Sequence, residues 1–233
     1  MRTKVLLCAA ALAASLASSM AQNVYSLNVV GYVNVTLPSL QFSAVANPLD
    51  ATMGGTVTGA NQMAAIFGST NGNIAGNSKI QQFVSALNDY SAQITYSGIS
   101  KKWGSTFDMP PGAGALYYNA GATPTVVTFV GQVPQGSYNV ASLGNLQFSL
   151  VGSPVPIGGD ITNSTTVVGL LPAANDGVQT FNSAANDWNA SSKWSAIGKK
   201  WSATASSTIG AGQGFLYYRA GAATTWVSNF TVQ

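Results

Sequence analysis

The sequence has no histidine and no glutamate, and its only cysteine is Cys8. Without histidine, neither a Ser-His-Asp nor a Cys-His catalytic site can be built, and zinc sites that need histidine or several cysteines are excluded as well. Charged residues make up 6% of the chain, against roughly 25% in an average soluble domain. We therefore expect a non-enzymatic protein that uses no metal and no cofactor.

The N-terminus has the pattern of a secretory signal. Arg2 and Lys4 precede an apolar run over residues 5–17, and small residues lead up to Ala21. This pattern predicts a signal peptide over residues 1–21. The alternative, an N-terminal membrane anchor, is disfavoured because the apolar run is shorter than the roughly 20 residues of a membrane span. The mature chain then has seven basic and six acidic residues, a net charge of 7 − 6 = +1. We expect a secreted protein, extracellular or at the cell surface with the periplasm as the alternative, that binds no nucleic acid and spans no membrane.

The rest of the chain is duplicated. Four pairs of segments match in the same order at offsets of 106, 98, 98 and 100, namely 40–48 with 146–154, 80–90 with 178–188, 99–103 with 197–201, and 112–122 with 212–222. A shorter echo of residues 30–33 at 130–133 marks the start of the repeat. The duplication predicts two units, residues 22–128 and residues 129–233.

The hydropathy pattern is that of β-strands. Apolar and polar residues alternate from Val24 to Leu37, which predicts one long half-buried strand. Shorter strands are predicted at 42–46, 81–85, 115–118 and 125–129 and at their equivalents in the second unit, with one short helix at 61–67. The predicted fold class is all-β, with two tandem, pseudo-symmetric antiparallel β-sandwich or barrel-like units packed side by side.

The chain resembles a family of uncharacterised secreted two-repeat β proteins of Verrucomicrobiota-like bacteria. The motifs that carry the resemblance are VVGYVNVTLP, FSAVANPLD, PPGAGALYYNAG, VTFVGQVPQG, FSLVGSPVP, GAGQGFLYY and a closing W-V-x-N-F. The half-repeat also looks like a small extracellular β module of Bacteroidetes proteins, whose N-L-I-G-N-P-Y and "aGqGFfv" stretches correspond to residues 150–154 and 212–215. The resemblance implies an extracellular β fold and supplies no catalytic residues.

Two repeated motifs have a structural interpretation. Gly112-x-Gly114 and its repeat Gly212-x-Gly214 precede Leu-Tyr-Tyr, a strand signal, whereas a phosphate-binding loop would precede a helix. We expect these glycines at a turn that enters a strand. Asn-Asp at 88–89 and 186–187 predicts turns, with calcium ligation or a glycosidase carboxylate pair as the alternatives.

Lysine and aromatic residues form the candidate ligand surface. A tryptophan face could stack on a sugar ring while lysines donate hydrogen bonds; the alternative is a core tryptophan beside lysines that point outward. The candidates are Lys101, Lys102, Trp103, Tyr118, Trp188, Lys199, Lys200, Trp201 and Tyr218. Because Trp188, Trp194 and Trp201 all lie in the second unit, an aromatic ligand-binding surface is expected there. In each Tyr-Tyr pair, one ring is expected inside and one outside.

The expected function is that of a secreted non-enzymatic structural or interaction protein of the cell surface or extracellular matrix, self-assembling through strand pairing into an oligomer or fibre. The alternative is a carbohydrate-binding module that uses exposed Trp and Tyr to hold a polysaccharide, and a hydrolase is a remote third. For self-assembly, the strand at 24–37 would pair with a free edge near Phe230 of the next molecule. The alternative is that this strand folds back onto its own unit.

Overall fold

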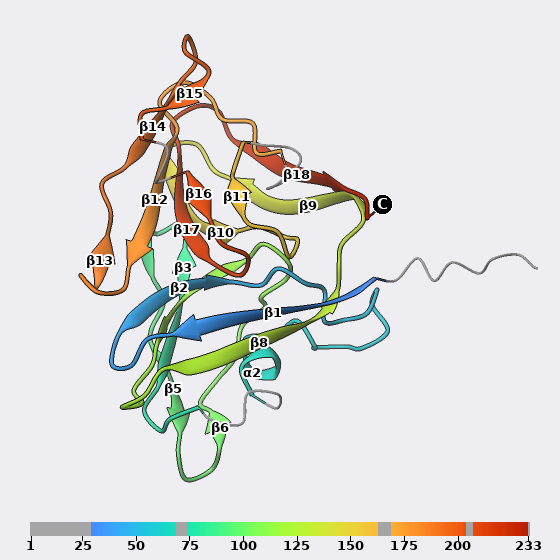
Figure 1. Cartoon of the computed structure of the whole chain (residues 1–233), viewed down its shortest axis with the longest axis vertical. Coiled ribbons are helices and arrows are strands. Elements are labelled where there is room, and N and C mark those ends of the chain that lie inside the picture. The colour runs from blue at the N-terminus through green and yellow to red at the C-terminus, as the bar shows by residue number, and fades with distance from the viewer. Residues whose placement is uncertain (1–28, 69–73, 163–168, 204–206, 233) are drawn as a thin grey trace, which may run out of the picture.

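The computed structural model describes residues 29–68, 74–162, 169–203 and 207–232, which form mostly strands (Figure 1). Two six-stranded antiparallel sheets share one topology. The first has the order β2 (Phe42–Ala46), β7 (Gly114–Tyr118), β3 (Lys79–Val84), β5 (Ile94–Ser97) and β6 (Lys102–Trp103), with β4 (Asp89–Tyr90) paired to β3. The second has the order β10 (Gln147–Gly152), β17 (Gly214–Arg219), β12 (Gly177–Asn182), β14 (Ser192–Ser195) and β15 (Lys200–Trp201), with β13 (Asp187–Trp188) paired to β12.

A two-stranded ribbon accompanies each sheet. The ribbons are β1 (Val30–Leu37) with β8 (Thr125–Gln132), and β9 (Gly136–Leu143) with β18 (Thr224–Phe230). The smaller elements are the helix α2 (Met63–Ile66) and the pair β11 (Gly159–Asp160) with β16 (Thr208–Ile209). No helix of the described residues is long and apolar enough to cross a membrane.

The two sheets lie back to back, and each packs its outer face on its ribbon. In the first unit, Val33 and Phe129 of the ribbon share a core with Val45 and Tyr117 of the sheet. On the opposite faces, Leu116 and Leu216 join a central cluster between the sheets. Each sheet is thus buried on both faces, which explains why segments such as 42–46 and 114–118 are apolar almost throughout.

Reciprocal contacts relate the two units by a pseudo-twofold axis. Ala46 N donates to Gly212 O at 2.9 Å, and the equivalent Gly152 N donates to Gly112 O at 2.9 Å. The hydroxyl pairs Ser43–Ser183 and Ser85–Ser149, which are also equivalent, both lie at 3.2 Å. A contact in which each partner offers the same surface is isologous and requires a twofold axis. A translation would instead juxtapose two different surfaces.

The repeated Gly-x-Gly motif serves this contact. As expected, Gly112 and Gly212 lie in turns, with φ of 87° and 76°, and Gly114 and Gly214 begin strands. A Cβ on Gly114 would lie 2.9 Å from Leu150 O, and one on Gly214 would lie 2.8 Å from Val45 O. The second glycine of each motif is therefore needed where the two sheets touch.

The all-β, two-unit prediction is confirmed, with open sheets in place of closed barrels. The matched segments predict that Phe42 and Phe148, Phe83 and Phe181, and Leu116 and Leu216 occupy equivalent core positions. The structure confirms these equivalences, and all six residues contribute to the central cluster. The helix predicted at 61–67 is shorter, Met63–Ile66.

The N-terminal strand and the seam between the units differ from the prediction. Residues 1–28, which include the predicted signal peptide and the start of the predicted strand, lie outside the described residues, and β1 begins at Val30. The similar residues 30–33 and 130–133 lie on neighbouring strands that pair with each other, with Tyr32 opposite Val130. These residues do not occupy equivalent positions in the two units. The strand equivalent to β1 is β9, because each leads into the first strand of its sheet. The predicted boundary at 128/129 falls inside β8.

Candidate functional site

The repeated Lys-Lys-Trp motifs lie in two equivalent hairpins, β5–β6 and β14–β15. Tyr96 pairs with Trp103 and Trp194 with Trp201 across the strands. Trp103 and Trp201 are 9% and 7% exposed, so neither offers a ring face to a ligand. Both tryptophans instead pack into the core of their unit.

The lysines of these motifs are all exposed. Lys101 and Lys199 adopt the left-handed conformation, with φ of 55° and 50°, and close the hairpin loops. In both hairpins the motif tryptophan is therefore part of the core while the neighbouring lysines point outward, which was the alternative to a sugar-binding surface. The lysines of the Lys-Lys-Trp motifs and the buried tryptophans Trp103 and Trp201 therefore do not form one sugar-binding surface.

The other aromatic candidates lie apart from the hairpins, beside the contact between the sheets. Tyr118 packs on Phe42 and Tyr218 on Phe148, each with ring centroids 4.9 Å apart. Trp188 packs edge-to-face on Phe181 at 5.1 Å and borders the central cluster. All three candidates are half-buried. Within each Tyr-Tyr pair the first ring, Tyr117 or Tyr217, is fully buried.

The Asn-Asp motifs are turns, with Asn88 and Asn186 at φ of 51° and 54°. Asp89 and Asp187 each accept a hydrogen bond from the next backbone N–H, at 2.7 Å. The described residues contain no group of three or more side chains that could hold a metal ion.

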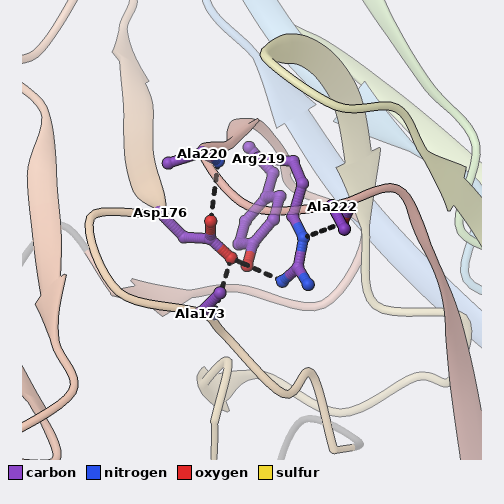
Figure 2. A network of polar contacts seen from close by, with 6 residues as sticks. Ala173, Asp176, Arg219, Ala220 and Ala222 are labelled. Atoms are coloured by element: carbon purple, nitrogen blue, oxygen red, sulfur yellow. Dashed lines mark hydrogen bonds and ion pairs between the residues drawn. The ribbon is translucent and has the colours of Figure 1, made fainter.

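A buried charged network that no sequence pattern indicated lies in the second unit (Figure 2). Asp176 is fully buried, and its Oδ2 accepts hydrogen bonds from Tyr217 Oη at 2.5 Å and Arg219 Nη1 at 2.8 Å. Its two oxygens also accept from the backbone N–H groups of Ala173 and Ala220, at 2.8 Å and 2.7 Å. Four donors thus occupy the carboxylate, which leaves it no evident role as a catalytic base.

The electrostatics of this network follow from burial. Desolvation raises the pKa of Tyr217, and the neighbouring Asp176 carboxylate raises it further because the phenol must remain protonated to donate. Arg219 has a side chain 12% exposed and also donates through Nε to Ala222 O at 2.9 Å. The network therefore fixes the end of β17 to the turn before β12.

Asp50 in the first unit is a second local network. Burial opposes its ionisation, but hydrogen bonds from Thr52 and Asn61 outweigh this effect and lower the carboxyl pKa. The backbone of Asp50 also pairs with Gln132 at the end of β8 through two bonds of 2.8 Å. This arrangement fastens the loop after β2 to the edge of β8.

Two of the hollows in the surface of the described residues lie beside the hairpins β14–β15 and β5–β6. A cleft of about 350 Å³ in the second unit is lined by Trp194, Lys199 and Leu171. A groove of about 630 Å³ in the first unit is lined by uncharged side chains, which include Gln82, Gln93, Thr95, Thr106 and Phe107. Only the first hollow combines an aromatic ring with a cation.

The two hairpin loops carry a feature that the sequence motif did not reveal. Ile99 and Ile197 precede the lysine pairs and are 98% and 99% exposed. Both isoleucines belonged to the repeated motif, yet the repeat alone could not show that they lie outside the core.

No protein-family model, no curated protein and no solved structure matches the chain.

Proposed function

We propose that the chain is a secreted, non-enzymatic structural or interaction protein that self-associates through the outer edge of β1. The observation that supports this proposal is the outer edge of β1, Val30–Leu37, which pairs with no strand among the described residues. A strand edge of this kind is a template for pairing with another chain.

The direction of the β1 edge follows from its register. Gln132 exchanges both backbone hydrogen bonds with Asp50, so its peptide groups point away from β1, and its partner there is Val30. Because backbone groups alternate along an antiparallel strand, Val30, Tyr32, Asn34 and Thr36 direct their N–H and C=O groups outward. All four residues are exposed, and within the described part of the chain these groups have no backbone partner.

This edge lacks the usual protection against pairing. β1 contains no charged residue, no proline and no bulge. The equivalent strand β9 differs, because its register with β18 shifts between Trp226 and Val227, and such a bulge disturbs an edge. Self-association is therefore expected at the first unit.

The partner that fits this edge is a second copy of β1. An uncharged strand can pair with itself in antiparallel orientation, which joins two ribbons into one four-stranded sheet around a twofold axis. The head-to-tail alternative would use the strand end at Phe230. That residue pairs with Gly136 and packs against the core of the first unit, so a β1–β1 dimer is the better-supported form.

Analytical ultracentrifugation over a range of concentrations tests the proposal. We expect a monomer–dimer equilibrium that Asn34→Pro abolishes, because proline removes a backbone donor that points outward and leaves the backbone pairing with β8 in place; the change also removes the exposed bond that Asn34 Oδ1 accepts from Thr128 Oγ1. Tyr32→Lys should weaken the dimer by about tenfold, a loss of about 1.4 kcal/mol, since an edge lysine opposes pairing. Asn139→Lys, at an exposed position of β9, is the matched control and should leave the equilibrium unchanged. A wild-type protein that stays monomeric at millimolar concentration would exclude this function.

A carbohydrate-binding role remains the second candidate because of the cleft at Trp194 and Lys199. A half-buried indole beside a lysine could stack on a sugar ring while the ammonium donates a hydrogen bond. Retardation of the protein in gels that contain neutral or acidic polysaccharides tests this role. Lys199→Gln should reduce the retardation and Lys101→Gln, at the equivalent hairpin of the first unit, should not.

A further inference from the structure

The hairpins β5–β6 and β14–β15 end at opposite ends of the long axis of the molecule (Figure 1). Their loops are residues 98–101 and 196–199, each followed by a lysine that begins the next strand. Each loop presents one nearly fully exposed isoleucine and one exposed lysine, and the lysine that begins the next strand is exposed as well. We call these the two tips: Ile99, Lys101 and Lys102 at one end, and Ile197, Lys199 and Lys200 at the other.

Both tips are held in the same conformation. Ser97 Oγ accepts a hydrogen bond from Ser100 N at 3.1 Å, and Ser195 Oγ accepts one from Gly198 N at 3.0 Å. Below each loop an aromatic pair clamps the two strands, Tyr96–Trp103 in one hairpin and Trp194–Trp201 in the other, with ring centroids 5.2 Å apart in both. The isoleucine is thus displayed on a rigid base.

Packing does not explain why the two units share these exposed residues. Exposed apolar positions elsewhere are shared in one case, Leu40 and Leu146 at 61% and 63% exposure, and differ in another, where Leu87, which is 74% exposed, is replaced by Ala185 at the equivalent turn. The isoleucine and both lysines are identical in the two tips. Exposed residues that contribute to neither core and are still shared indicate contact with something outside the chain.

Charge is concentrated at the tips. They hold four of the seven basic residues between 29 and 232, while the rest of that stretch has three basic and six acidic residues, a net of 3 − 6 = −3. The one ion pair of the described residues is Arg219–Asp176, so the lysines of the tips are not neutralised by acidic neighbours. The complementary partner is anionic and also accepts an apolar side chain.

We propose that each tip docks on the surface of an anionic lipid bilayer. The isoleucine enters the boundary between head groups and acyl chains, and the two ammonium groups contact lipid phosphates. An acidic polysaccharide would pair with the lysines but would leave the isoleucine in water. Because the tips lie at opposite ends (Figure 1), one molecule contacts two separate bilayers and bridges them.

The test uses the purified protein with vesicles of phosphatidylcholine containing 30% phosphatidylglycerol, and with pure phosphatidylcholine. We expect co-sedimentation and clustering, seen by light scattering, with the anionic vesicles only. A lysine near an anionic surface contributes about fivefold in affinity, so Lys101→Gln/Lys102→Gln should weaken binding by its tip roughly 20-fold. Ile99→Ser should weaken that tip by several-fold.

Single-tip variants separate bridging from simple binding. With one tip disabled by all three substitutions, the protein should still co-sediment with anionic vesicles but should no longer cluster them, at concentrations where ultracentrifugation shows a monomer. Lys79→Gln/Lys193→Gln removes two charges outside the tips and should change neither readout. The proposal is overturned if the wild type does not co-sediment with anionic vesicles, if it binds acidic polysaccharide and not the vesicles, or if single-tip variants cluster vesicles as the wild type does.

Discussion

The two units satisfy one equivalent buried position with different chemistry. In the second unit, Asp176 gathers four donors, among them Arg219 (Figure 2). In the first unit, Ser78 occupies the place of Asp176 and accepts one bond, from Ala120 N at 3.2 Å. Asn119 occupies the place of Arg219 and donates instead to the backbone oxygens of Leu37 and Thr123, at 3.2 Å and 3.1 Å.

This difference shows which part of the network the fold requires. The backbone N–H of Ala120 or Ala220 needs an acceptor in both units, and either a hydroxyl or a carboxylate meets that need. The tyrosine does not need a partner, because the buried Tyr117 hydroxyl has no hydrogen bond of normal geometry. Burial is the main cause that raises the pKa of Tyr117; the nearby Ser78 hydroxyl opposes this shift and the charge of Tyr96 adds to it. The first unit distributes its polar contacts, whereas the second concentrates them on one charge.

The largest expected effect is therefore in the second unit. Asp176→Asn leaves the half-buried Arg219 without its counter-charge and should lower the free energy of unfolding by about 3 kcal/mol, the low end of the range for a broken buried pair. Ser78→Ala, the matched change in the first unit, should cost only about 1 kcal/mol. Urea denaturation of the three proteins measures both values.

A double variant sharpens the comparison. Asp176→Ser/Arg219→Asn copies the first unit into the second and should be more stable than Asp176→Asn, because no unpaired charge remains. Equal losses for Asp176→Asn and Ser78→Ala would show that the charged network adds nothing to the neutral one.

The central cluster is where the two units should respond alike. Phe42 and Phe148 have the same partners, yet both rings are half-buried. Phe42→Ala and Phe148→Ala should each cost about 2–3 kcal/mol, below the range of about 3–5 kcal/mol for a fully buried ring. Thermal and urea unfolding measure both losses, and a difference above about 1 kcal/mol would indicate that the twofold equivalence is structural but not energetic.

The sequence predicts this fold where apolar runs are long and bounded by turn residues. The predicted strand at 42–46 coincides with β2, and the matched segments place the two sheets correctly. The hairpins β5–β6 and β14–β15 escaped prediction because their strands have only two to four residues, too few for a periodic signal. The similarity of residues 130–133 to residues 30–33 gave a wrong start for the second unit, because neighbouring strands that pair edge to edge can carry similar residues.

The candidate sites were less predictable, for a physical reason. The repeat pointed to the Lys-Lys-Trp motifs, but burial of Trp103 and Trp201 depends on cross-strand partners that the motif does not contain. The Asp176 network joins residues 41 to 44 positions apart. Because the first unit has serine at the equivalent position, comparison of the two halves could not single out the carboxylate.

The smallest expected effect concerns alkaline pH, at a position where the units differ in their ability to ionise. Tyr90 occupies the place of Trp188, and its hydroxyl has no hydrogen-bond partner of normal geometry in the described chain. Burial raises the pKa of Tyr90 to about 12, with a smaller contribution from Asp89. The folded state therefore keeps a proton that the unfolded chain loses above pH 10.

Tyr90 thus stabilises the fold fully below pH 10, and this contribution is lost as the pH rises through 12. Tyr90→Trp, which copies the second unit, should reduce the loss of stability between pH 10 and 12 by at most about 2 kcal/mol. Some alkaline sensitivity should persist, because burial, with Asp50 nearby, also raises the pKa of Tyr138 to about 12. Urea unfolding at pH 9, 10, 11 and 12 measures the difference, with Tyr32→Phe, at a tyrosine 70% exposed, as the control. Parallel stability curves for Tyr90→Trp and the wild type would show that Tyr90 ionises without consequence for the fold.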